Sequence, residues 1–474
     1  MFKAAIFLYR PAFARAIVYM LQSVEYRPGA YLKWLERVKD FRQVTYRKDL
    51  VPTRPAQLLL WTFRLGSLVE IIISLLLLWR GLHDKSFSLV AYGLALFLAT
   101  PLLWSVLIIL PLWLGEWLIV RPGNFVRIRL ASDILATHPG VKIAVAGSYG
   151  KTTMKEILAT ILSEGKKVAA TPANKNVSIS HARFAAGLHG DEDILILEYG
   201  EGRPGDVARF AKLTHPDIGV ITGLAPAHLD KYKTLHAAGQ DIFSLNRFVK
   251  KLYVDTDSPS VEPFLKKAYV QFSSGGIDSW PVSSVKMDIK GLSFELGAQD
   301  GLKVKSRLLG RHLIAPLVLA IYLARQYGLS DKQIQAGIDK IESFEHRMKP
   351  YQLSGAWIID DTYNGNIEGM KAGLVLLNDL PAKRKIYVTP GLVDQGADSD
   401  TIHQELGQAI TKAAPDEVIL MKHTVTDSIV KGMAKYKGQL TVEDDPLDFY
   451  TSLDKYVAAG DLVLLQNDWP DQYN

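Results

Sequence analysis

The pattern of apolar and polar residues divides the chain into an N-terminal part with long apolar stretches and a longer part with short alternating elements. Residues 86–115 run for thirty positions without Asp, Glu, Lys, Arg or His, which exceeds the roughly 20 residues that a helix needs to cross a bilayer's hydrocarbon core. Pro101 and Pro111 are expected to kink this helix or to mark its end. A second apolar stretch, at residues 58–79, is interrupted by Arg64 and Glu70.

The two apolar stretches together predict a transmembrane helical hairpin at residues 58–120. Residues 80–87 are long enough only for a hairpin loop. A charge at the bilayer centre costs roughly 2.5 to 3.5 kcal/mol on an insertion scale, so Arg64 and Glu70 should lie near one interface or face the other helix. A buried helical hairpin in a soluble protein is the alternative interpretation.

Basic residues are concentrated before the apolar region. Residues 1–57 contain eleven Lys or Arg and four Asp or Glu, whereas the whole chain has a net charge of +6. We interpret residues 1–57 as a basic juxtamembrane segment. The positive-inside rule then predicts a multi-pass protein of the cytoplasmic membrane, with the domains that follow the hairpin in the cytoplasm. Because a nucleic-acid-binding protein would carry its basic charge on a folded face, no nucleic acid partner is expected.

The first 22 residues resemble a signal peptide only in part. Arg10, Pro11 and Arg15 interrupt the apolar stretch, and no small-residue cleavage site follows. An interfacial helix is the preferred interpretation.

From about residue 138, short β-rich runs alternate with helical patterns. This alternation is typical of an α/β fold with a largely parallel sheet. A chain of 474 residues exceeds what one core usually organises, and we divide this part into a central α/β domain at 138–345 and a Rossmann-like domain at 346–474. The absence of cysteine excludes disulfides, cysteine–zinc sites and thiol catalysis. Strands are expected at residues 142–146, 193–198, 218–222, 356–359, 385–389, 417–421 and 462–465.

A glycine-rich turn connects the first of these strands to a helix expected at residues 154–162. The turn reads Gly147-Ser148-Tyr149-Gly150-Lys151-Thr152-Thr153. Such a turn directs backbone N–H groups and the positive helix end at an anion. Lys151 is expected to reach the outer phosphates of ATP, and Thr152 is expected to ligate Mg²⁺. The full P-loop pattern has a glycine where this chain has Val145, so a plain strand-to-helix turn remains the alternative.

Two further strands end in side chains that suit a metal ion. Residues 193–197 lead into Glu198, and residues 218–222 lead into a loop that contains His228. Ligands gather outside the carboxyl ends of the strands in an open parallel sheet, so Glu198 and His228 should approach the phosphates and could hold a second cation. A helix-start carboxylate and a loop histidine are the alternative readings.

Five ordered motifs resemble the Mur ligases, and the resemblance is greatest to the branch that adds D-Ala-D-Ala to UDP-N-acetylmuramoyl-tripeptide. The motifs are the glycine-rich turn, Thr171-Pro172-Ala173-Asn174-Lys175-Asn176, Glu198-Tyr199-Gly200 with Arg203-Pro204-Gly205-Asp206, Ala227-His228-Leu229, and His346-Arg347-Met348 with Asp360-Asp361-Thr362-Tyr363-Asn364-Gly365-Asn366. The resemblance implies an ATP-dependent amide ligase. Such an enzyme phosphorylates a substrate carboxylate and lets an amine attack the acyl phosphate.

The resemblance also implies roles for individual residues. Lys151, Glu198, His228 and Arg347 would be catalytic, and Thr152, Glu198 and His228 would hold Mg²⁺. The ATP-binding set would comprise Gly147, Ser148, Gly150, Lys151, Thr152, Thr153, Asn174, Asn176, Asp361, Tyr363, Asn364 and Asn366. Turn asparagines after Pro172 are the alternative reading of Asn174 and Asn176.

The chain departs from the family pattern at several places. Many members have a carbamylated lysine a dozen residues after the His-Leu pair, where this chain has no lysine and Gln240 or Asp241 is the nearest candidate ligand. Leu313 and Pro316 replace expected asparagines, so the adenine contacts are expected to differ.

The basic membrane hairpin occupies the place of the family's UDP-binding domain. We therefore expect a membrane-anchored ligase of cell-wall precursor synthesis, acting on a UDP- or lipid-linked peptide and an amine donor. Two alternatives remain open: a ligase of this fold acting on another lipid-linked or polyglutamate-type substrate, and a catalytically weakened nucleotide-binding scaffold.

Overall fold

The computed structural model describes residues 7–24, 26–38, 41, 50–172, 175–226, 229–297, 301–342, 347–363, 365–392, 395, 398–422 and 425–467. The contacts divide the chain into two compact units, residues 1–126 and 127–474.

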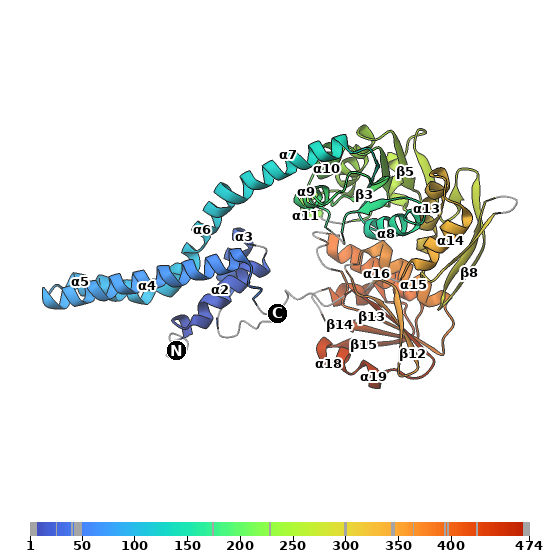
Figure 1. Cartoon of the computed structure of the whole chain (residues 1–474). Helices are drawn as coiled ribbons and strands as arrows, with labels where there is room; N and C mark the ends of the chain where they lie inside the picture. The colour runs from blue at the N-terminus through green and yellow to red at the C-terminus, as the bar shows by residue number, and fades with distance from the viewer. Residues whose placement is uncertain are drawn as a thin grey trace. The chain divides into compact units, whose positions relative to one another are not determined.

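The N-terminal unit is helical, and its two longest helices, α4 and α5, lie side by side (Figure 1). Its helices are α2 (Pro11–Ser23), α3 (Pro28–Arg37), α4 (Arg54–His83), α5 (Phe87–Leu107) and α6 (Ile109–Gly115), followed by a π-helical turn at Glu116–Val120. The helix α7 (Arg121–Thr137) then leads into the second unit. Two helical stretches, Arg54–His83 and Phe87–Thr137, are long and apolar enough to cross a membrane.

Small residues form the contact between α4 and α5. A Cβ atom added to Gly66 would lie 2.0 Å from the Trp104 ring, and one added to Gly93 would lie 2.9 Å from the side chain of Leu78. Other small or hydroxyl-bearing residues of the two helices are also buried: Ser74, Gly81, Thr100 and Ser105. Large apolar side chains point outward instead, and Leu58, Leu76 and Leu98 are 68%, 59% and 60% exposed.

The two prolines of the second apolar stretch have different effects. Pro101 lies inside α5, whereas α5 ends at Leu107, four residues before Pro111. A proline at position 111 has no N–H for the carbonyl of Leu107, which accounts for the interruption.

The helix α2 buries its apolar face against the protein. Phe13, Ile17 and Leu21 are fully buried, and the Phe13 and Phe63 rings lie 5.9 Å apart. This packing onto α4 differs from the expectation of a helix that leaves its apolar face to a lipid interface.

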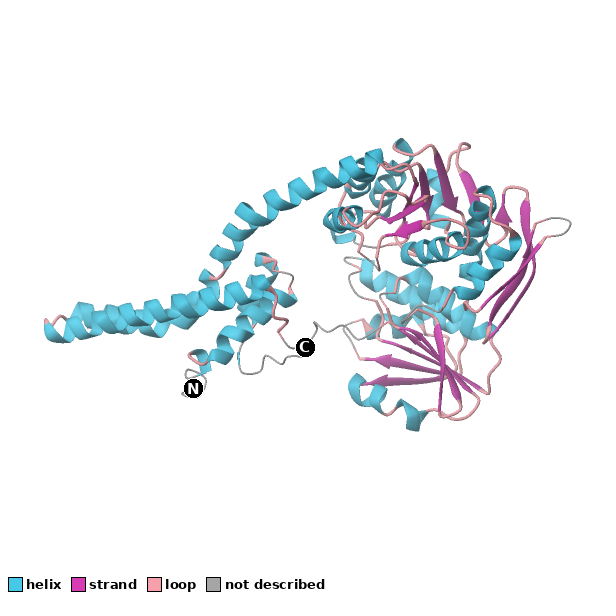
Figure 2. Ribbon diagram, in the orientation of Figure 1, coloured by secondary structure: helices cyan, strands magenta, loops and turns pink. Residues whose placement is uncertain are grey.

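The second unit contains two α/β sheets, each with helices packed against it (Figure 2). The first sheet has the order β10-β9-β8-β7-β6-β5-β4-β1-β3-β2. Its strands are β1 (Val141–Ala146), β2 (Val168–Ala170), β3 (Ile194–Glu198), β4 (Ile218–Ile221), β5 (Lys251–Asp255), β6 (Val270–Ser273), β7 (Gly276–Ile277), β8 (Trp280–Asp288), β9 (Gly291–Leu296) and β10 (Leu302–Ser306). Its helices are α8 (Lys151–Leu162), α9 (Ser178–Ala185), α10 (Asp206–Thr214), α11 (Leu229–Tyr232), α12 (Leu235–Phe243), α13 (Ile314–Gln326) and α14 (Asp331–Lys340).

The predicted parallel sheet is confirmed for strands β1 to β6. The pairs from β6 through β10 are antiparallel and form an extension that the sequence analysis did not predict. The helices α8 and α13 pack on the parallel part of the sheet, and α14 packs against α8 and β10. Ile157, Leu317 and Ile338 of these helices are fully buried in one core. Helix α8 begins at Lys151, three residues earlier than expected.

The C-terminal sheet has the order β11-β12-β16-β13-β14-β15. Its strands are β11 (Lys349–Leu353), β12 (Ala356–Asp361), β13 (Arg384–Thr389), β14 (Glu417–Met421), β15 (Gln439–Glu443) and β16 (Asp461–Gln466), and its helices are α15 (Ile367–Asp379), α16 (Ser399–Ala413), α17 (Thr426–Gly432), α18 (Pro446–Thr451) and α19 (Leu453–Tyr456). Only β11 pairs in the antiparallel sense. The four strands expected here are therefore confirmed.

Candidate active site

The glycine-rich turn lies between β1 and α8, at the carboxyl edge of the parallel sheet. Gly147 has φ 143° and Gly150 has φ 74°, a region that L-residues rarely adopt. A Cβ atom on Gly147 would also lie 2.4 Å from the Thr222 hydroxyl, so only glycine fits there. Val145, where the full P-loop pattern has glycine, is a buried residue inside β1. The turn is thus a shortened P-loop that starts at Gly147.

The start of α8 suits an anion such as a phosphate. Its N-cap residue, Gly150, has no side chain to cap the helix. The first N–H groups of α8 can therefore donate hydrogen bonds to an external acceptor. The Ser148 amide donates to the Gly223 carbonyl at 2.9 Å and ties the turn to the end of β4.

The Lys151 ammonium group is held by two acceptors. It donates to the Gly147 carbonyl at 2.6 Å and lies 2.7 and 2.9 Å from the two carboxylate oxygens of Glu201. The Lys151 and Glu201 side chains are 12% and 5% exposed. Sequence reasoning missed Glu201, although its position three residues after the end of β3 was a usable signal.

Glu198 lies at the end of β3, next to the P-loop, because β3 pairs with β1 in a register that sets Glu198 opposite Val145. Its Oε1 atom accepts hydrogen bonds from Thr152 Oγ1 at 3.1 Å and from Asn176 Nδ2 at 3.2 Å. The structure thus brings three predicted site residues together.

The ammonium group of Lys155, which sequence reasoning missed, also lies close to Glu198. Lys155 is fully buried on α8, one turn after Lys151, and its ammonium group lies 3.6 Å from Glu198 Oε2 and 2.8 Å from the Thr171 carbonyl. The i, i+4 spacing of Lys151 and Lys155 on one helix face was the available signal.

These residues fit a magnesium ion. Glu198 Oε2 is buried and has no hydrogen-bond partner among the described residues, and Mg²⁺ prefers oxygen ligands such as carboxylates. Thr152 and Glu198 would hold such an ion. The described part of the chain contains no group of three or more His, Asp or Glu side chains that could hold a metal. His228, the third expected ligand, lies outside the described residues, as do Asn174 and Asn364.

The residues that could replace the carbamylated lysine have other bonds. Both carboxylate oxygens of Asp241 accept hydrogen bonds, one from the Gly205 amide at 2.9 Å and one from the Tyr232 hydroxyl at 2.8 Å. The Gln240 side chain is hydrogen-bonded to the ring of His236 at 3.0 Å. Both residues thus have structural partners.

A crevice joins the P-loop to the C-terminal sheet. It has a volume of about 150 Å³, and its lining includes Gly150, Thr153, Arg347, Asp361, Tyr363 and Asn366. Six of the predicted site residues, from both sheets, therefore line one crevice. The Arg347 guanidinium lies 4.6 Å from the centre of the Tyr363 ring, and the Asn366 side chain caps α15 by accepting from the Gly369 amide at 3.0 Å. Leu313 and Pro316 line the same crevice.

Two carboxyl groups in this crevice have raised pKa values. Burial raises the pKa of Asp255 to about 8 and that of Asp361 to about 7. Asp361 also accepts hydrogen bonds from the Met348 amide at 3.3 Å and from Gln466 Nε2 at 2.7 Å, which oppose the shift. Near neutral pH a protonated carboxyl group adds no negative charge to a site that suits phosphates.

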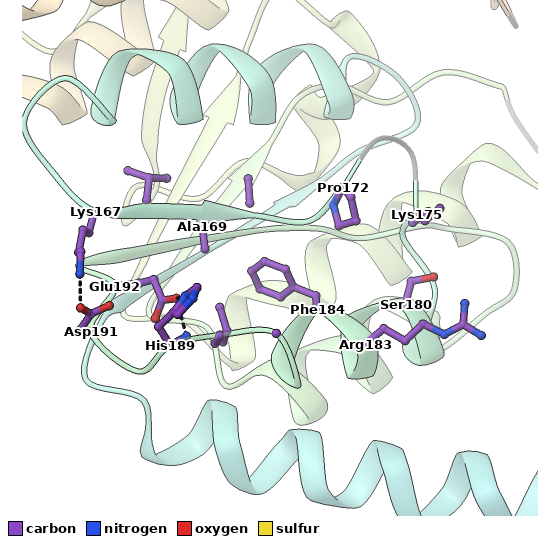
Figure 3. A pocket seen from close by; sticks show the side chains of 14 residues that line it. Lys167, Ala169, Pro172, Lys175, Ser180, Arg183, Phe184, His189, Asp191 and Glu192 are labelled. Atoms are coloured by element: carbon purple, nitrogen blue, oxygen red, sulfur yellow. Dashed lines mark hydrogen bonds and ion pairs between the residues drawn. The ribbon is translucent and has the colours of Figure 1, made fainter.

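A larger pocket, of about 720 Å³, lies along the edge strand β2. Figure 3 shows Lys175, Ser180 and Arg183 at one end of it, with Phe184 between them and the Lys167–Asp191 ion pair. Lys175 directly precedes Asn176, which binds Glu198. The basic end of the pocket is therefore linked to the Glu198 carboxylate by one residue.

Two family models match this unit. Residues 145–324 match the Mur ligase middle domain, and residues 346–466 match the Mur ligase, glutamate ligase domain. The UDP-N-acetylmuramoyl-tripeptide–D-alanyl-D-alanine ligase of Escherichia coli is 28% identical over 335 residues, which cover 68% of this chain and 74% of that protein. The corresponding Synechocystis ligase is 27% identical over 332 residues, 68% of this chain and 71% of that protein.

Solved structures share the fold. MurF from Acinetobacter baumannii superimposes with a TM-score of 0.64 at 20% identity, covering 73% of this chain and 77% of that chain. MurF ligase from Thermotoga maritima in complex with ADP gives a TM-score of 0.62 at 23% identity, covering 73% and 80%.

Proposed function

Because the chain belongs to the Mur ligase family of ATP-dependent C–N ligases, we propose that it is a membrane-anchored peptide ligase of cell-wall precursor synthesis. Its acyl substrate is a muramoyl-type peptide, by analogy with the named relatives, and its second substrate is an amino acid or dipeptide amine. The observation that carries the proposal is the meeting of Lys151, Thr152 and Glu198 at the shortened P-loop.

The proposed reaction consumes ATP as a substrate. The γ-phosphoryl group passes to the acyl carboxylate, which gives an acyl phosphate and ADP. The amine nitrogen then attacks the acyl carbon, an amide bond forms, and phosphate and a proton are released. Because an anion must approach an anion in the first step, the protein contributes mainly positioning and positive charge.

Residues of this chain supply that charge. Lys151 and the uncapped start of α8 face the phosphates, and Arg347 contributes from the C-terminal domain. Thr152 and Glu198, with His228 by resemblance, would hold Mg²⁺, which when bound offsets charge on the phosphate oxygens. Lys175 and Arg183 suit an anionic part of the acyl substrate in the pocket beside β2.

The proposed membrane anchor is the α4–α5 pair. Water-soluble helix pairs bury large apolar side chains between them, whereas membrane helices pack through small residues and leave large apolar side chains to the lipid. The α4–α5 pair has the second pattern: Gly66, Ser74 and Gly93 lie at the contact, and leucines point outward. With basic residues before the hairpin, this arrangement supports catalytic domains on the cytoplasmic side.

Two measurements test the proposal. The full-length protein, given ATP, Mg²⁺, a muramoyl peptide and an amine, should release phosphate only when both acceptor and amine are present, and Lys151→Ala should abolish that release. Phosphate release independent of acceptor and amine, or an active Lys151→Ala enzyme, would contradict the ligase assignment of this site. Extraction of the protein from membranes by alkaline carbonate would contradict the anchor.

A further inference from the structure

The N-terminal unit contains a groove that the proposed chemistry does not use. It has a volume of about 500 Å³ and lies between the residues at the start of α2, the first half of α4 and the middle of α5. Pockets that bind small molecules usually measure roughly 300 to 1,000 Å³. The charged residues among its described lining are Arg10 and Arg64, and no acidic residue accompanies them. The remainder of the lining is mostly apolar.

Polar side chains in the lining of this groove can donate hydrogen bonds. The ion pairs in the described part of the N-terminal unit are Arg80–Asp84 and Arg121–Glu116, so neither groove arginine has a carboxylate partner there. Ser67 also lines the groove, and its buried hydroxyl has no hydrogen-bond partner among the described residues. Two guanidinium groups and a hydroxyl form a donor set that matches the oxygens of a phosphate.

The position of Arg64 along α4 sets this residue near an interface in the proposed membrane-spanning arrangement. Arg64 and Arg80 are separated by sixteen residues, or roughly 24 Å of helix. This length approaches the roughly 30 Å hydrocarbon core, and arginine side chains extend toward the interface from just inside it. Leu68 and Ile71 lie one and two turns closer to Arg80 and also line the groove. In the proposed membrane-spanning arrangement, Arg64 therefore lies at headgroup depth, and Leu68 and Ile71 lie at the depth of the lipid chains.

We propose that this groove binds a phosphate-bearing membrane lipid, with the phosphate between Arg10 and Arg64 and the upper part of the chain along Leu68 and Ile71. Charge complementarity favours an anionic lipid as the ligand. An arginine without a counter-ion inside an apolar helix costs free energy in a membrane, and an anionic headgroup removes that cost. The inference rests on the proposed membrane function and deepens it. A lipid-linked acyl substrate belongs to the class of ligand that the groove selects.

Lipid titration of the full-length protein in detergent micelles, followed by native mass spectrometry, tests this inference. The probes are a polyprenyl phosphate, the polyprenol of the same chain length, and inorganic phosphate. We expect the polyprenyl phosphate to bind at least about tenfold more tightly than the polyprenol, since charge-assisted hydrogen bonds form only with the phosphate. Inorganic phosphate, which lacks the chain, should not compete at equal concentration.

Variants locate the site. Arg64→Gln and Arg10→Gln should each lower the affinity for the polyprenyl phosphate by about tenfold, and Arg64→Lys should keep part of it. Arg80→Gln is the matched control, because Arg80 lies on the same helix, pairs with Asp84 and is 72% exposed. Arg10 is exposed at the start of α2, so its substitution carries the test even if α4 variants fail to fold.

Three results would overturn the inference: equal affinity for polyprenol and polyprenyl phosphate, full affinity in a folded Arg10→Gln/Arg64→Gln protein, and equal competition by inorganic phosphate. The outcome is separable from that of the proposed function. Ligase activity with soluble substrates and retention in carbonate-washed membranes are measured on the same variants. If both persist while lipid selectivity is absent, only the groove assignment fails.

Discussion

The buried ion pair between Lys151 and Glu201 predicts that Glu201→Gln increases the affinity for ATP. The ammonium group lies 2.7 and 2.9 Å from the two carboxylate oxygens, and the side chains are 12% and 5% exposed. When ATP binds, its phosphate oxygens must either replace Glu201 as the partner of Lys151 or interact with Lys151 together with Glu201. The pair therefore stabilises the protein without nucleotide more than the nucleotide complex.

The magnitude follows from the burial of this pair. Removing one partner of a buried pair costs about 3 to 5 kcal/mol, which the substitution should take from the stability of the nucleotide-free protein. The ATP phosphates restore a counter-charge for Lys151. If the phosphates recover even about 1.4 kcal/mol of the penalty, ATP binds tenfold more tightly to the variant.

Isothermal titration with a non-hydrolysable ATP analogue and Mg²⁺ measures this effect, and thermal unfolding with and without the analogue provides an independent reading. The variant should melt at a lower temperature than the unsubstituted protein, and the analogue should raise its melting temperature by more. Glu164→Gln is the matched control, because Glu164 follows the end of α8 and pairs with Lys340, which is 63% exposed. Weaker binding by Glu201→Gln would refute the reasoning and place Glu201 among the groups that hold the bound nucleotide or metal.

Three further predictions concern buried ionisable side chains. Lys155→Met removes the cation 3.6 Å from Glu198 Oε2, so Mg²⁺ with an ATP analogue should raise the melting temperature of the variant more than that of the unsubstituted protein; equal shifts would show that Lys155 does not compensate Glu198. Burial raises the pKa of Asp255 to about 8, and because the unfolded chain loses this proton near pH 4, the free energy of unfolding should fall by up to about 1.4 kcal/mol per pH unit between pH 4 and 8. Asp255→Asn should remove the contribution of this residue to the slope in denaturant titrations and leave that of Asp361, whose pKa is raised to about 7; an unchanged slope would contradict the assignment. Asp241→Asn weakens two hydrogen bonds, so it should lower stability while the Mg²⁺ concentration at half-maximal activity stays constant; a severalfold rise in that concentration would make Asp241 a metal ligand.

The sequence by itself determined the structural elements that depend only on residues close together in the chain. The strand, glycine turn and helix around Gly150 depend on the conformations of a few neighbouring residues, and the structure has all three in the expected order, with the helix beginning three residues earlier than expected. The four strands of the C-terminal sheet follow from short apolar runs in the same way. The end of α5 before Pro111 follows from the missing N–H of proline.

The tertiary structure decided the contacts between residues distant in the chain. Glu201 and Lys151 are fifty residues apart, and they meet because β3 lies beside β1, a strand order that local patterns do not encode. The antiparallel extension from β6 to β10 depends on the same kind of information, as does the crevice that joins Gly150 to Asp361. Apolar runs specify that a helix or strand is buried, but the partner that buries it is chosen by the packing of the whole domain, and the pairings of charged groups depend on that choice.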